Sequence, residues 1–162
     1  MDKTFISLVN KNLGIAHKVS QIYFNDQDSR LDAIQEMMYQ LWKSYPSFDQ
    51  RSRFSTWMYS VCLNTALTYL KKNKGNKNET LNESHHHIPN EHTADQEEQS
   101  AQLRRAISLL SSLNKAIILL YLEGHSYDEI SEITGLTKSN VSVRLVRIKK
   151  ELEKRLKKTF SH

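Results

Sequence analysis

The chain is poor in the residues that break helices and form tight turns. Its 162 residues include four Gly and two Pro, and runs of alternating apolar and polar residues between turn dipeptides are hard to find. A fold built from β-hairpins would need both turn residues and alternating apolar and polar runs. We therefore predict a mainly helical protein and treat a sheet as the poorer interpretation.

Cysteine and long apolar runs are also nearly absent. Cys62 is the sole cysteine, so an intrachain disulfide is excluded, and its apolar surroundings indicate a buried thiol in a reducing compartment. The N-terminus has no basic region followed by an apolar run, and no stretch of about eighteen consecutive apolar residues occurs. We expect a soluble, cytoplasmic protein with no membrane insertion.

Charge is distributed unevenly along the chain. The net charge is +5 and the pI is about 9.3, which by itself only hints at a polyanionic partner. Residues 138–158 contain nine Lys or Arg against two acidic residues, whereas residues 78–98 contain six acidic residues and no Lys or Arg. The basic charge is therefore concentrated in the C-terminal segment.

Three stretches follow one another in the sequence. Residues 1–74 and residues 95–162 have apolar side chains at helical spacing, whereas residues 75–94 are polar and acidic. The middle stretch lacks the apolar residues that would offset the entropy of ordering it, so we expect a flexible linker. The predicted fold class is all-α, with a three-helix bundle and a helix-turn-helix domain joined by that linker.

The apolar pattern of the first stretch predicts three helices. One long helix covers residues 4–23 and tolerates Gly14, a second begins near residues 27–29 and ends at Tyr45-Pro46, and a third covers residues 54–72. We expect the second helix to face inward with its apolar residues Leu31, Ile34, Met38, Leu41 and Trp42.

The last stretch contains the most informative local signals. A capping-box pattern at residues 93–96 opens a helix with Leu103, Ile107 and Leu110, and a very apolar helix covers residues 113–122. Residues 126–129 form a second capping box, Gly135 makes a turn, and Thr137 can cap the final helix. Two helices around a short glycine-containing turn predict a helix-turn-helix.

The final helix has two different faces. Its buried stripe is predicted by a spacing of three or four residues and consists of Val141, Leu145, Ile148 and Leu152. The opposite face then presents Ser139, Asn140, Val143, Val146, Arg147 and Lys150, with Ser142 and Arg144 at its flanks. In a major groove, Asn and Arg bind base edges and Val contacts thymine methyl groups, while the last lysines suit phosphates. A solvated basic helix or a coiled-coil arm is the alternative, but the capped helices and the glycine turn favour DNA binding.

Three segments resemble one protein family. The segment from Gly124 to Arg147 closely resembles region 4 of sigma-70-family factors, especially the small extracytoplasmic-function (ECF) group. Residues 32–42 resemble region 2.2, and residues 54–64 resemble region 2.3 running into region 2.4. Because these signatures occur in the right order around a variable linker, the resemblance covers nearly the whole chain except that linker.

The resemblance implies an alternative sigma factor that binds core RNA polymerase and promoter DNA. The polymerase β′ clamp would contact Asp32, Gln35 and Glu36, and the β flap would contact region 4. The minus-10 element would be opened and held by Trp57, Tyr59, Asn64, Lys71 and Lys72, with Asn64 in the pocket for a flipped base. The minus-35 element would be read by Lys138, Ser139, Asn140, Ser142, Val143, Arg144, Val146 and Arg147. An anti-sigma factor is a further possible partner.

Several of these residues also have ordinary structural explanations. Asp32, Gln35 and Glu36 fit a solvated helix face, and Trp57 fits a core aromatic residue. Lys71 and Lys72 fit the C-terminal end of a helix dipole.

The sequence departs from the family pattern at four points. The short leading helix usual in the family is expected to be missing or shortened. Thr68 stands where an acidic residue is usual, and Asn114 stands where Pro is common, which we expect to affect only the start of a helix. Val143 and Val146 make the reading face more apolar than in many members, which indicates a minus-35 element with accessible methyl groups.

Other functions have weaker support. His85, His86, His87 and His92 are close together, but no Cys or regular ligand spacing joins them, so we expect no metal and no cofactor. No phosphate loop, nucleophile elbow or zinc-hydrolase motif is present, so an enzyme is not expected. The main alternative is a conventional helix-turn-helix regulator with an N-terminal helical sensing or dimerisation domain. A partner-binding adaptor that touches no DNA is a third possibility.

Overall fold

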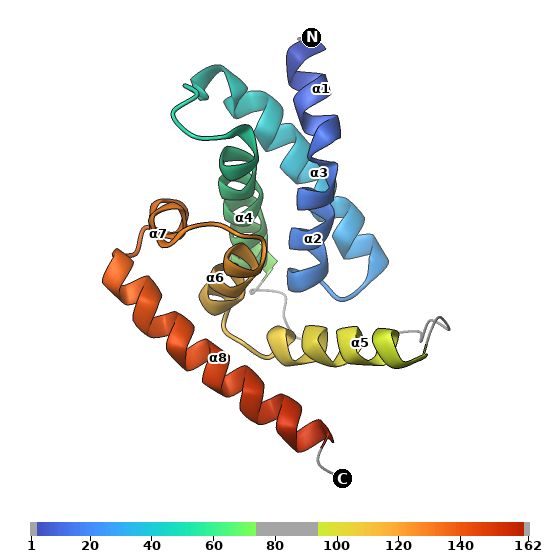
Figure 1. Ribbon diagram of the computed structural model, residues 1–162. Helices are drawn as coiled ribbons and strands as arrows, with labels where there is room; N and C mark the ends of the chain where they lie inside the picture. The colour runs from blue at the N-terminus through green and yellow to red at the C-terminus, as the bar shows by residue number, and fades with distance from the viewer. Residues whose placement is uncertain (1–2, 74–93, 161–162) are drawn as a thin grey trace. The chain divides into compact units, whose positions relative to one another are not determined.

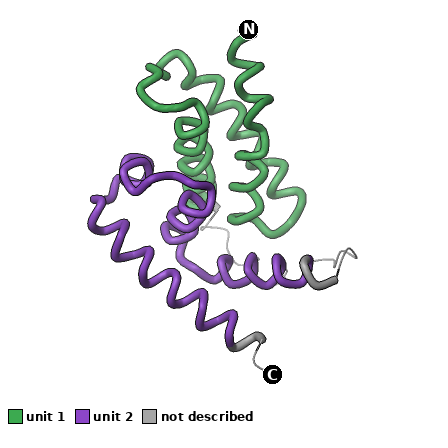
Figure 2. Tube along the Cα trace, in the orientation of Figure 1, with its two compact units in different colours: residues 1–87 green, residues 88–162 purple. Residues whose placement is uncertain are grey.

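A computed structural model describes residues 3–73 and 94–160 of the chain, and every regular element in these residues is a helix. The chain forms two compact units, residues 1–87 and residues 88–162 (Figure 2). The predicted all-α, two-domain fold is confirmed. Nearly all of the predicted linker, the histidines at 85–92 and the capping residue Thr93 lie outside the described residues. Among the described helices, none is both long and apolar enough to cross a membrane.

The first unit contains helices α1 (Lys3–Lys11), α2 (Leu13–Tyr23), α3 (Gln27–Ser44) and α4 (Phe54–Asn73), with the 3₁₀ turn η1 (Tyr45–Ser47) after α3 (Figure 1). Helices α2, α3 and α4 pack against one another. Their shared core includes the fully buried side chains Val19, Ala33, Met37, Leu41, Met58, Cys62 and Ala66.

The prediction of a single long helix over residues 4–23 is wrong, because the helix is interrupted at Asn12. This residue has φ −116° and ψ 19°, and its Nδ2 donates a hydrogen bond to the Leu8 carbonyl at 2.9 Å. Its own N–H bonds to the Val9 carbonyl, three residues back, instead of continuing the α-helical pattern. An Asn side chain can compete with helical backbone bonds in this way, so residues 3–73 form four α-helices instead of the predicted three.

Helix α3 begins as predicted, and its predicted inward face is correct only in part, because Leu41 is buried and Ile34 and Met38 are half-buried. Its N-cap is Asp26, whose carboxylate accepts a hydrogen bond from the Ser29 N–H at 2.9 Å, and this bond lowers the pKa of Asp26. Ala33, Met37 and Leu41, spaced by four residues, are fully buried. Leu31 and Trp42, for which the apolar pattern predicts an inward position, are half exposed. Small Ala33 allows close packing of this narrow seam, so the larger apolar residues remain outside it.

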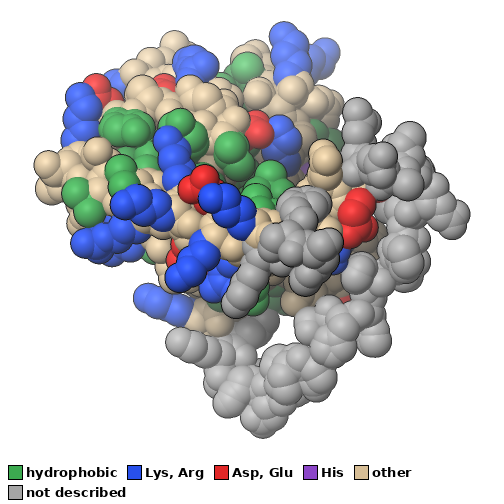
Figure 3. Space-filling model, turned by 60° about the horizontal axis from the view of Figure 1, so that its bottom comes forward, with side chains coloured by type: hydrophobic (Ala, Val, Ile, Leu, Met, Phe, Trp, Pro, Cys, Tyr) green, Lys and Arg blue, Asp and Glu red, His purple; other side chains and the backbone are tan. Residues whose placement is uncertain are grey.

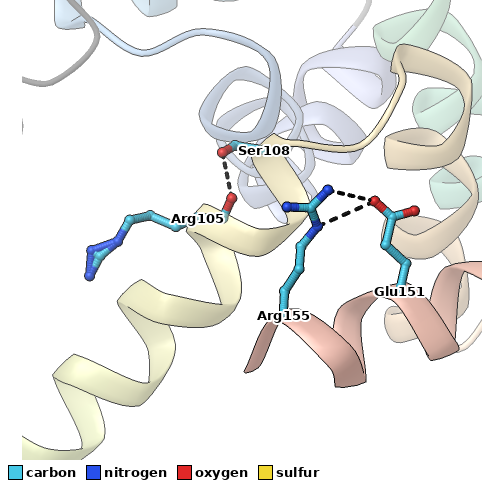
Figure 4. Close-up of polar contacts among 4 residues, drawn as sticks. All are labelled: Arg105, Ser108, Glu151 and Arg155. Carbon is cyan, nitrogen blue, oxygen red and sulfur yellow. Dashed lines mark hydrogen bonds and ion pairs between the residues drawn. The ribbon is translucent and has the colours of Figure 1, made fainter. Parts of the chain in front are cut away.

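The second unit contains α5 (Ala94–Ser108), α6 (Ser112–Leu122), α7 (Tyr127–Thr134) and α8 (Lys138–Phe160). Helix α6 packs against α7 and α8, and α5 packs against α8. The predicted stripe of α8 is confirmed, since Val141, Leu145, Ile148 and Leu152 are all buried. Figure 4 shows the neighbouring ends of α5 and α8, where Arg155 donates to Glu151 Oε2 at 2.9 and 3.3 Å.

The caps and turns of the helix-turn-helix are those predicted. Ser126 Oγ accepts from the Glu129 N–H at 3.1 Å, and the Glu129 carboxylate accepts from the Ser126 N–H at 3.0 Å. Gly135 ends α7 with φ 80°, and Thr137 Oγ1 then accepts from the Asn140 N–H at 3.1 Å. These local bonds determine where α7 ends and α8 begins.

Gly135→Ala is expected to lower the free energy of unfolding by about 1 kcal/mol, because alanine must adopt a left-handed conformation there. No atom would meet the added methyl group, so the cost is conformational and not steric. Gly14→Ala is the matched control. Gly14 is helical and equally open, so the same substitution should raise stability by up to roughly 0.5 kcal/mol. Denaturant unfolding followed by circular dichroism measures both; shifts of the same sign would contradict the assigned role of Gly135.

Candidate nucleic-acid interface

The exposed face of α8 is the first candidate surface. Ser139, Asn140, Val143, Val146, Arg147 and Lys150 are all exposed, as predicted from the buried stripe on the other side. Val143 and Val146 are 49% and 52% exposed, so their methyl groups are accessible on this face. Lys138, at the start of the helix, pairs with Asp128 of α7 at 3.2 Å. The face therefore combines amide, hydroxyl, guanidinium and methyl groups.

Cations and apolar groups lie together on the molecular surface. Figure 3 shows Lys and Arg side chains gathered on the face turned toward the viewer, with hydrophobic side chains exposed among them. Among the α8 side chains that the structure describes, residues 138–157, the exposed cations are Lys138, Arg147, Lys149, Lys150, Lys154, Arg155 and Lys157. Such a surface attracts phosphates and also offers apolar contacts.

One flank of α8 is tied to α6 through Arg144. Its Nη1 donates to Asn114 Oδ1 at 3.1 Å, and its Nε donates to Asn140 Oδ1 at 3.2 Å. Arg144 is therefore half-buried, as is Ser142 on the opposite flank. The expectation that Asn114 affects only the start of a helix is too narrow. Its N–H does bond to the capping Ser111 Oγ, but its side chain accepts a bond from a residue 30 positions later.

The other flank of α8 is held by Lys149. Its Nζ donates to the Tyr121 hydroxyl at 2.9 Å and lies 4.2 Å from the centre of the Tyr121 ring. The hydrogen bond from the ammonium group to this hydroxyl raises the pKa of Lys149. Neither contact to α6 could be predicted from the sequence, because a polar pair between distant helices leaves no periodic pattern.

The second candidate surface is a groove of about 460 Å³ between α3 and α4. One wall is a row on α3, Glu36, Gln40 and Ser44, and the other is a row on α4, Asn64, Thr68 and Lys72. Gln40 Nε2 donates to Glu36 Oε2 at 2.9 Å. The structure thus brings the predicted base-pocket residue Asn64 together with Lys72 and with Glu36, a predicted polymerase contact. Asp32, Gln35 and Lys71 are exposed but do not line the groove.

The two aromatic residues predicted at the minus-10 site occupy different environments. Trp57 is half-buried in a cluster with Tyr45, Phe48 and Phe54, with ring centres 5.0 to 6.2 Å away. Tyr59 is only 2% exposed, so its ring is part of the core and cannot face DNA in this conformation. The predicted role of Tyr59 at the minus-10 site stays a prediction, and its burial favours support of that element through packing.

The described residues offer binding groups and no metal cluster. Within residues 3–73 and 94–160, no three His, Cys, Asp or Glu side chains lie close enough to hold a metal ion. The groups that do converge are amides, hydroxyls and cations, which bind bases and phosphates. The arrangement suits recognition of nucleic acid.

Comparison with known proteins identifies the family. The family model of sigma-70 region 2 matches residues 8–75, and that of sigma-70 region 4 matches residues 100–152. The chain therefore belongs to the sigma-70 family of RNA polymerase sigma factors, in its ECF group. The region 2 match also accounts for the N-terminal unit, so the alternative of a conventional helix-turn-helix regulator is not favoured. Sigma factors are initiation factors that act with RNA polymerase on promoter DNA, and they are not catalysts.

Individual relatives agree with this assignment. The chain is 29% identical over 138 residues to the ECF RNA polymerase sigma-E factor of Haemophilus influenzae, covering 77% of this chain and 73% of the relative. It is 27% identical over 143 residues to the sigma factor SigV of Bacillus subtilis, covering 88% and 84%. The sigma factor RpoE from Bartonella quintana, solved in complex with the anti-sigma factor NepR, shares the fold with a TM-score of 0.77. That match has 21% identity and covers 96% of this chain and 98% of the other.

Cys62 lies two residues before Asn64 but points into the core. Burial raises the pKa of its thiol to about 12, as expected for a buried cysteine. At pH 8 the thiolate population should then be on the order of 10³-fold lower than for an unperturbed thiol.

We therefore expect the native protein to react very slowly with a chromogenic disulfide reagent at pH 8, and rapidly in guanidinium chloride. Ser7→Cys, which adds an exposed thiol on α1, is the matched control and should react at once in the native protein. Equal native rates for the two thiols would show that Cys62 is accessible.

Proposed function

We propose that this sigma factor directs core RNA polymerase to its promoters through one DNA contact in each unit. The observation that carries the proposal is the complete helix-turn-helix, whose second helix exposes Asn140, Val143 and Arg147 opposite a buried apolar stripe. In proteins of this architecture, the second helix enters the major groove and the residues near its N-terminus contact base edges.

Unit 2 reads the minus-35 duplex in this proposal. Arg147 hydrogen-bonds guanine, Val143 and Val146 contact thymine methyl groups, and Asn140 contacts a base edge. Lys138, Ser139 and Ser142 contact phosphates or bases at the sides of this face, and Arg144 contributes from the flank. The exposed valines support a minus-35 element with accessible methyl groups.

Unit 1 opens and holds the minus-10 strand. Asn64 offers donor and acceptor groups to an unpaired base in the groove, and Lys71 and Lys72 follow the phosphates. The groove volume falls within the usual range for sites that enclose a small ligand group. Trp57 supports strand opening from its aromatic cluster, and Tyr59 contributes by packing beneath this element.

Core polymerase binds the outer face of α3. Asp32, Gln35 and Glu36 share that face and are exposed, which supports their contact with the β′ clamp, while unit 2 contacts the β flap. Glu36 also lines the groove, so the polymerase contact adjoins the minus-10 site. Binding to polymerase places the factor in the cytoplasm. An anti-sigma partner is supported by the structure of the Bartonella quintana relative, which is a complex with one.

Asn64→Ala should reduce transcription from a promoter that needs this factor by about tenfold, because an unpaired base loses its hydrogen bonds in the groove. Open complexes should be lost more than duplex binding. The measurement is reconstituted transcription with core polymerase, together with permanganate footprinting of melted thymines. Asn10→Ala, which removes an exposed amide on α1, is the matched control and should retain full activity. Transcripts that core makes equally well without the protein would refute the proposed function.

Arg147→Ala should weaken holoenzyme binding to a minus-35 duplex by about tenfold or more. Arg155→Ala removes the same charge from the same helix, but Arg155 pairs with Glu151, so binding should change less than threefold or so. Filter binding at two salt concentrations measures both variants. If both variants lost the same amount of DNA binding, Arg147 would contribute only general charge attraction and no base contact. A conventional regulator would instead bind a palindromic duplex without polymerase.

A further inference from the structure

Two polar contacts hold α8 against α6, one on each flank of the recognition helix. Arg144 reaches Asn114 near the start of α6, and Lys149 reaches Tyr121 near its end. The apolar stripe lies between these flanks and packs the helix into its unit. The two contacts differ in one respect, because only the Arg144 contact includes a residue of the exposed reading face.

The Arg144 guanidinium connects Asn114 to Asn140. Its Nη1 donates to Asn114 Oδ1 at 3.1 Å, and its Nε donates to Asn140 Oδ1 at 3.2 Å. The guanidinium is planar and rigid, so fixing one of its nitrogens also fixes the direction of the others. The Asn140 amide is thereby oriented with its oxygen toward Arg144, and its Nδ2 remains as the donor for DNA.

We propose that Asn114 is a positioning residue that sets the base preference of the recognition helix, by holding Arg144 at the flank and Asn140 in a donor orientation. This inference rests on the proposed function of α8 as the minus-35 reader. Asn114 itself touches no base and acts through Arg144.

The chemistry of base edges gives the expected direction of the effect. An unrestrained Asn pairs with adenine through both its oxygen and its nitrogen, and an unrestrained Arg pairs with guanine through two donors. In this structure the Asn140 oxygen is bound by Arg144, so Asn140 offers DNA mainly its Nδ2 donor. Arg144 is held toward α6 by its hydrogen bond to Asn114. Releasing Arg144 should therefore shift preference toward adenine opposite Asn140 or toward guanine within reach of Arg144.

The test uses the full chain assembled with core RNA polymerase and a promoter library randomised in the minus-35 element. Asn114→Ala removes the acceptor but keeps the backbone N–H that bonds to Ser111. We expect the base preference to change by about fivefold or more at one or two base pairs, with the other positions unchanged. Asn114→Asp keeps an acceptor for Arg144 and should retain the wild-type preference. Circular dichroism and core binding check that each variant is folded.

Tyr121→Phe is the matched control, because it removes the other α6–α8 hydrogen bond without touching Arg144 or Asn140. Its base preference should equal that of the wild type. If Asn114→Ala lowers binding to all sequences equally, or if Tyr121→Phe shifts the preference in the same way, the positioning role is overturned. If the wild-type holoenzyme enriches no element, the proposed function fails and this inference falls with it. If the wild type enriches an element and Asn114→Ala enriches the same one, only this inference fails.

Discussion

The burial of one apolar stripe on α8 is the constraint on which the proposed DNA-reading surface depends. Val141, Leu145, Ile148 and Leu152 are each at most 7% exposed, and burial of such side chains contributes about 2 kcal/mol apiece. Successive residues are separated by 100° around the helix, so rolling α8 by one position would expose much of this stripe. The packing therefore leaves the opposite face exposed, which is the face that we propose reads DNA. The two flanking contacts to α6 restrict the orientation of the helix further.

Short-range features of this fold could be predicted from the sequence because their causes are local. The capping box at Ser126 and the turn at Gly135 each depend on residues within one helical turn, and the α8 stripe depends on simple periodicity. The contact of Arg144 with Asn114 joins positions 30 residues apart and obeys no period. The break at Asn12 could not be predicted either, because the apolar spacing continues across it while a single side-chain bond interrupts the helix.

The error on α3 has a different physical origin. Leu31, Tyr39 and Trp42 are about half exposed on a helix whose buried seam is Ala33, Met37 and Leu41. A helix with apolar residues on two faces does not show from periodicity which face is buried in its own domain. A second apolar face is typical of surfaces that bind a partner. The exposed apolar face that suits α3 to the proposed polymerase contact thus also made its core face difficult to predict.

In the proposed complex, different side chains of α8 contribute to DNA affinity and to the choice of DNA sequence. Its lysines and arginines attract phosphates, and this attraction weakens as salt rises because bound counterions must be displaced. The contacts of Val143 and Val146 depend on apolar surface that is half exposed in the free protein, and salt weakens such contacts far less. The hydrogen bonds that join Asn114, Arg144 and Asn140 likewise orient these side chains and add no charge to the surface. In the proposed recognition, sequence choice on this helix therefore depends on Arg147, on the uncharged side chains of the exposed face and on how Arg144 is held. The remaining positive charge attracts any DNA.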